Sequence, residues 1–81
     1  MSVTVYTSTH CPWCVKTEEF LDSINVPYEA VNVSQNHEAA AELVNKTRQR
    51  GVPVTKINDN YIVGFNEGAI RSALKDAGYQ V

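Results

Sequence analysis

The chain has 81 residues, of which 43% are hydrophobic and 20% are charged, and its formal net charge is -2. This length allows a single domain over residues 1–81, and the mildly acidic balance argues against nucleic-acid binding, which requires a basic surface. No stretch has the roughly 20 apolar residues of a membrane helix, and the N-terminus lacks the basic and apolar regions of a signal peptide. We therefore expect a cytoplasmic protein that binds neither membranes nor nucleic acids.

The first part of the chain predicts a strand, a helix and a second strand. Residues 2–7 form a short run rich in β-branched side chains, which favours a strand. Pro12 suits the first turn of a helix, and apolar side chains then recur at helical spacing from residue 13 to about residue 25. Pro27 closes that segment, and residues 28–33 predict the next strand.

The second half of the chain begins with another helix. Either Ser34 or Asn36 is expected to cap its N-terminus, and Gly51 is expected to end it. Residues 54–57 and 61–63 predict two strands joined by a turn of the sequence Asn-Asp-Asn.

A last helix is predicted between Asn66, as its cap, and Gly78, as its stop. The predicted order is thus βαβ followed by ββα. A βαβ unit gives a parallel strand pair, and the tight turn gives an antiparallel pair. We therefore predict an α/β fold with a mixed four-stranded sheet and three helices.

Two cysteines stand where the first strand gives way to the first helix. Cys11 and Cys14 are three residues apart, so both side chains lie on one face of the helix start and their sulfurs can meet. Unpaired N–H groups and the helix dipole stabilise an anion at this position, which lowers the pKa of a thiol. Because the thiolate is the nucleophile of disulfide exchange, the pair predicts a redox site in which Cys11 attacks and Cys14 resolves.

Metal binding is an alternative function for the two cysteines. A closed zinc site needs four ligands, and the other typical ligands in the chain are His10 and His37. An incidental pair of thiols is a further alternative. On the residues alone these readings remain open, although the spacing favours redox chemistry.

The motifs together resemble the glutaredoxin family over nearly the whole chain. The resemblance is carried by Val5-Tyr6-Thr7, Cys11-Pro12-Trp13-Cys14, Gly51-Val52-Pro53 and Val63-Gly64-Phe65. It implies the thioredoxin fold, a monomer, and a dithiol enzyme that reduces protein disulfides or glutathione mixed disulfides.

The resemblance also implies several substrate-binding residues. Pro53 should follow a cis peptide bond and face the disulfide, and the backbone of Val52 should pair with substrate as an added strand. Arg50 matches a family position near a glutathione carboxylate, while Asn66 and Glu67 match the region that meets the γ-glutamyl group. Trp13 is expected to be exposed and to contact partners.

Two positions depart from the pattern of glutathione-using members. Ser8 replaces their Lys or Arg, and Phe65 replaces the second glycine of a Gly-Gly pair, so we expect weak glutathione binding. The Gly-Phe pair is similar to that of NrdH-redoxins, which take electrons from thioredoxin reductase and pass them to ribonucleotide reductase. Either glutathione or thioredoxin reductase is therefore the expected electron source, without a tightly bound cofactor. Binding of an iron–sulfur cluster is a further alternative.

Overall fold

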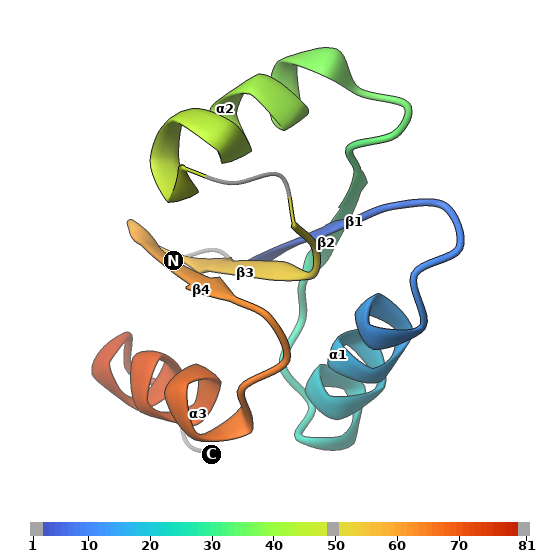
Figure 1. Cartoon of the computed structure of the whole chain (residues 1–81). Coiled ribbons are helices and arrows are strands. Elements are labelled where there is room, and N and C mark those ends of the chain that lie inside the picture. The colour runs from blue at the N-terminus through green and yellow to red at the C-terminus, as the bar shows by residue number, and fades with distance from the viewer. Residues whose placement is uncertain (1–2, 49–50, 80–81) are drawn as a thin grey trace.

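The computed structural model describes residues 3–48 and 51–79. Its elements follow the predicted order, βαβ and then ββα (Figure 1). They are β1 (Val3–Thr7), α1 (Pro12–Ser23), β2 (Glu29–Asn32), α2 (His37–Thr47), β3 (Val54–Ile57), β4 (Asn60–Val63) and α3 (Glu67–Asp76).

The four strands form one mixed sheet in the order β2-β1-β3-β4. Strand β1 pairs with β2 in parallel, with Val5 opposite Ala30, and with β3 in the antiparallel sense, with Val5 opposite Thr55. Strand β4 pairs with β3 in the antiparallel sense. The predicted mixed four-stranded sheet is confirmed, and β1, which leads to the cysteine pair, is one of its central strands.

The helices cover the two faces of the sheet unequally, with α1 and α3 on one face and α2 on the other (Figure 1). Because successive side chains of a strand point to opposite faces, Val5 contributes to the core beneath α1 and α3, and Tyr6 packs beneath α2. The larger core includes Leu21 of α1 and Leu74 of α3, and the smaller one includes Leu43 of α2.

The end of α2 differs from the prediction. We expected Gly51 to end this helix, but the helix ends at Thr47. Arg48 adopts the left-handed conformation, with φ of 62°, and its N–H donates to the carbonyl of Val44 at 2.8 Å. A residue in this conformation ends a helix whether or not it is glycine, so the expectation for Gly51 was wrong.

The start of α2 resolves the choice between two caps. The side chain of Asn36 accepts a hydrogen bond from the N–H of Ala39 at 3.0 Å, so Asn36 is the cap. The hydroxyl of Ser34 instead accepts from the N–H of Thr9 at 3.4 Å, which ties together the loops after β1 and β2.

The remaining boundaries shift by one or two residues. Helix α1 ends at Ser23, and the β3–β4 turn is shorter than expected because Asn60 already pairs with Ile57. The predicted limits of α3 are confirmed: Asn66 caps it, and Gly78 follows it with φ of 100°. Across residues 3–48 and 51–79, no helix combines the length and apolar character needed to cross a membrane.

Candidate active site

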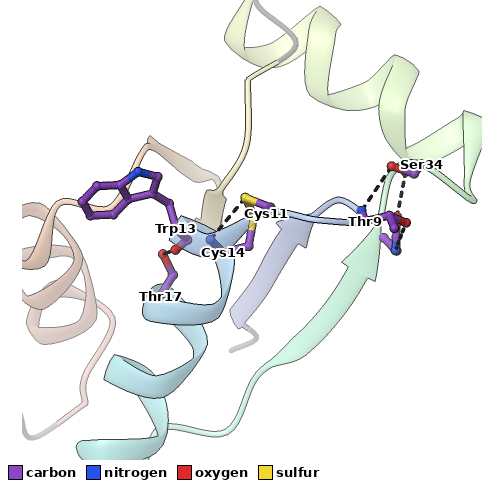
Figure 2. Close-up of a disulfide and its surroundings, with 7 residues drawn as sticks. Thr9, Cys11, Trp13, Cys14, Thr17 and Ser34 are labelled. Carbon is purple, nitrogen blue, oxygen red and sulfur yellow. Dashed lines mark hydrogen bonds between the residues drawn. A yellow bond between two sulfur atoms is a disulfide. The ribbon is translucent and has the colours of Figure 1, made fainter.

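Cys11 is the N-cap of α1. Its backbone is extended, with φ of -117° and ψ of 97°, and Pro12 opens the helix directly after it. The Sγ of Cys11 accepts a hydrogen bond from the N–H of Cys14 at 3.2 Å (Figure 2). The sulfur therefore occupies the place of a capping oxygen, where the free N–H groups and the dipole of a helix stabilise negative charge.

Cys11 and Cys14 form a disulfide (Figure 2). Their Cα atoms are 5.3 Å apart, within the usual range for such a bond. Cys14 is buried, with 2% of its surface exposed, whereas Cys11 is partly exposed. The spacing thus brings the two sulfurs together as predicted, and it leaves Cys11 as the more accessible of the two.

The loop before Cys11 is held by hydrogen bonds to the end of β2. The N–H of Thr9 donates to Ser34 Oγ at 3.4 Å, and Asn32 Nδ2 donates to Thr9 Oγ1 at the same distance. The N–H of Ser34 in turn donates to Asn32 Oδ1 at 2.8 Å. Figure 2 shows Thr9 and Ser34 facing each other beside the disulfide. We did not predict this network, because Thr9 lies more than 20 residues before Asn32 and Ser34 and forms no local motif with them.

A shallow hollow beside the disulfide gives access to Cys11. Apart from the two cysteines and Pro12, its lining consists of Thr7, Ser8, His10, Val15 and Glu18. Burial raises the pKa of Glu18, and the charge of nearby Asp22 raises it further.

The segment before β3 reaches the same end of the sheet. The peptide bond between Val52 and Pro53 is cis, as the family resemblance implies, and Pro53 is buried. The carbonyl of Pro53 accepts a hydrogen bond from the N–H of Gly64 at 2.8 Å. Because Val54 pairs with Tyr6 near the end of β1, Pro53 lies at the sheet end from which the chain continues to Cys11.

A row of aromatic side chains extends from the active-site turn toward α3. Trp13 is 57% exposed, which confirms the predicted exposure, and its ring centroid lies 6.2 Å from that of Phe65. Phe65 meets the ring of Phe20 edge-on at 6.0 Å. Lys16 Nζ lies 5.2 Å from the Trp13 ring centroid, and Arg71 Cζ lies 5.1 Å from that of Phe20. In Figure 2 the indole is directed away from the two sulfurs.

The glutaredoxin family model matches residues 3–62 of this chain. The chain belongs to the glutaredoxin family. It is 41% identical over 68 residues to an uncharacterized glutaredoxin-like 8.6 kDa protein in the rubredoxin operon of Clostridium pasteurianum, and the match covers 84% of this chain and 91% of that relative.

Two solved structures show the same fold. Methanoredoxin of Methanosarcina acetivorans is 31% identical with a TM-score of 0.83, over 96% of this chain and 85% of that one. NrdH-redoxin of Escherichia coli is 29% identical with a TM-score of 0.78, over 89% of this chain and 93% of that one. With its Cys11–Cys14 disulfide, this member of the family is a thiol–disulfide oxidoreductase of the thioredoxin fold.

The structure places most of the predicted substrate-binding residues of this glutaredoxin-family chain. Trp13 is exposed beside the cysteine pair, and Val52 is half-buried ahead of Pro53. Asn66 and Glu67 lie at the exposed start of α3, where Asn66 Oδ1 already accepts from the N–H of Ala69 at 3.1 Å. Arg50 lies outside the described residues. The roles of these residues in substrate binding remain predictions.

Proposed function

We propose that the protein reduces disulfides of partner proteins by a dithiol cycle. The observation that carries this proposal is the unequal exposure of the two cysteines at the helix start, since Cys11 is partly exposed and Cys14 is buried. The nucleophile of exchange must reach a partner, whereas the resolving thiol needs to reach only its neighbour.

Each step of the cycle exchanges one sulfur–sulfur bond for another. The Cys11 thiolate attacks one sulfur of the partner disulfide, which breaks that bond and releases the other sulfur as a thiolate that takes up a proton. The Cys14 thiolate then attacks Cys11 Sγ, forms the internal disulfide and releases the second partner sulfur. Two electrons pass to the partner, and because the two cysteines carry both of them, the proposed cycle uses no bound cofactor.

The substrate segment is proposed to pair with the backbone of Val52 as an added strand. Its position before the buried cis Pro53, at the end of the sheet that leads to Cys11, supports this role. Trp13 is proposed to contact apolar side chains of the partner, which its 57% exposure supports.

For the electron source we favour a reductase of the thioredoxin reductase type over glutathione. Phe65 stands where glutathione-using relatives carry a small residue, and its ring lies between Trp13 and Phe20. Trp13 and Phe20 both belong to α1, so Phe65 packs against two rings of one helix, and admitting a tripeptide would require breaking these contacts. The E. coli NrdH-redoxin, whose structure is described as the basis of a thioredoxin-like activity profile, supports the same choice by its similarity to this chain.

The catalytic roles are tested by two cysteine variants. Cys14→Ser should form a stable mixed disulfide with an oxidised peptide substrate, detected by mass spectrometry, because the attack occurs without resolution. Cys11→Ser should form no mixed disulfide and should not reduce the peptide. Reduction of the peptide at the wild-type rate by Cys11→Ser would overturn the proposal.

The electron source is tested by NADPH oxidation with insulin as the disulfide substrate. We expect turnover with thioredoxin reductase, and weak turnover with glutathione plus its reductase. Phe65→Gly should raise the glutathione-dependent rate by about tenfold or more, whereas Phe65→Leu, which keeps the bulk of the side chain, should not. Saturable, efficient turnover of the wild type with glutathione would contradict this assignment.

A further inference from the structure

We propose that Glu42 is a positioning residue, which fixes the substrate-pairing segment at Val52 and Pro53 from the face of the sheet opposite α1. This inference rests on the proposed function, in which the backbone of Val52 pairs with the partner. It assigns a role to a cluster of side chains that takes no part in the exchange of sulfur bonds.

The Glu42 cluster consists of Glu42, Tyr6, Lys56 and Tyr61. Glu42 Oε2 accepts hydrogen bonds from the hydroxyl of Tyr6 at 2.8 Å and from the hydroxyl of Tyr61 at 2.7 Å. Lys56 Nζ lies 3.7 Å from the same oxygen. These three partners come from β1, β4 and β3, so one carboxylate of α2 is bound to three adjacent strands.

These polar contacts matter because α2 has little apolar contact with the sheet. Among the residues of α2, all of which the structure describes, Leu43 alone is buried. Helix α1, by comparison, buries four residues. The two tyrosine hydroxyls bind a charged acceptor, and such hydrogen bonds are about twice as strong as those between neutral groups. The position of α2 on the sheet therefore depends strongly on Glu42.

The small core next to Glu42 extends to the substrate-pairing segment. Leu43, the residue after Glu42, packs with Tyr6 and Val54, and Val52 packs against this core. Val54 is also the strand partner of Tyr6. A displacement of α2 would therefore remove the surface on which Val52 rests. The disulfide, in contrast, lies at the start of α1, and α1 covers the other face of the sheet (Figure 1).

The test compares Glu42→Ala with wild type in reduction of the same oxidised peptide. We expect KM to rise by about tenfold while kcat stays within about twofold, because the variant loosens binding without changing the sulfurs. The rate of Cys11 alkylation by iodoacetamide should be unchanged. Glu42→Gln keeps an acceptor oxygen and should recover most of the wild-type KM. Glu38→Ala, an exposed substitution on the same helix, is the matched control and should behave as wild type.

Two results would overturn the inference. One is an unchanged KM in Glu42→Ala despite lower thermal stability, which would make the cluster purely structural. The other is slower alkylation of Cys11, which would place the effect at the nucleophile. If Glu42→Ala fails to fold, Tyr61→Phe removes one donor and keeps the ring, and an unchanged KM in that folded variant overturns the inference equally. Failure of the proposed function is distinct, because it appears in Cys11→Ser with Glu42 intact.

Discussion

Replacing Thr55 with valine should stabilise the protein. Thr55 lies in β3, opposite Val5 on one side and Ile62 on the other, and is fully buried. Among the residues that the structure describes, its hydroxyl has no hydrogen-bond partner. Valine has nearly the same shape, so the substitution removes an unsatisfied polar group without opening a cavity.

The size of the effect follows from the cost of burying such a group. A buried donor or acceptor without a partner costs about 1–3 kcal/mol, so Thr55→Val should raise the free energy of unfolding by about that amount. The change is large beside the total stability of a small domain, which is about 5–15 kcal/mol. For a domain of this size, 1 kcal/mol corresponds to a rise in Tm of roughly 4–8 °C.

Urea unfolding followed by circular dichroism measures this change, and Thr17→Val is its matched control. Thr17 is as fully buried as Thr55, but its hydroxyl donates to the carbonyl of Trp13 at 3.0 Å. The control should therefore lose about 0.5–1.5 kcal/mol of stability. Both variants should keep the wild-type slope against urea concentration. If Thr55→Val were no more stable than wild type, the hydroxyl must be satisfied in solution and the reasoning would fail.

Three further predictions concern the site and its surroundings. In the reduced protein, iodoacetamide should modify Cys11 and spare Cys14, because Cys14 is 2% exposed; peptide mass spectrometry showing equal labelling would contradict this. Hydrogen bonds from the hydroxyl of Tyr61 and, to a smaller extent, from that of Tyr6 lower the pKa of Glu42. Its ionisation therefore contributes stability above the unfolded pKa of about 4.3, and this contribution is lost as the pH falls through the lower folded pKa. Urea unfolding of wild type and Glu42→Gln should differ most near neutral pH and converge in acid, and a gap that stays constant would refute the linkage. Finally, Asn66→Ala should cost about 1 kcal/mol by removing the cap of α3, whereas Asn66→Asp should cost much less, as measured by thermal unfolding.

Local sequence patterns were sufficient to predict the element order. Alternation and helical spacing identified the strands and helices, and two of the three helix caps are the asparagines that a capping rule selects, Asn36 and Asn66. The end of α2 could not be predicted in this way. Arg48 adopts the left-handed conformation there, and nothing about an arginine favours it over the glycine that follows three residues later.

The cysteine pair was predictable because its geometry is local, within one turn of a helix. The contacts around it are not local. Phe65 meets Trp13 across 52 positions of sequence, and Glu42 meets Tyr6 across 36. On its own helix Glu42 has the pattern of a solvated charge, and only the folded structure shows that the hydroxyl of Tyr6 donates to it. The cis bond before Pro53 also depended on the family resemblance, since only about 5–6% of such bonds are cis.

Cys11 has two roles, as the reactive thiol and as the side chain that caps its helix. The residue chosen to replace it therefore decides whether a loss of activity can be assigned to the thiol alone. Serine places an oxygen in nearly the same position and is a preferred capping residue, so it should remove the chemistry and leave the helix start intact. Alanine removes both, and its inactivity would combine a lost nucleophile with a frayed helix. A serine variant that unfolds like wild type would therefore report on the sulfur alone.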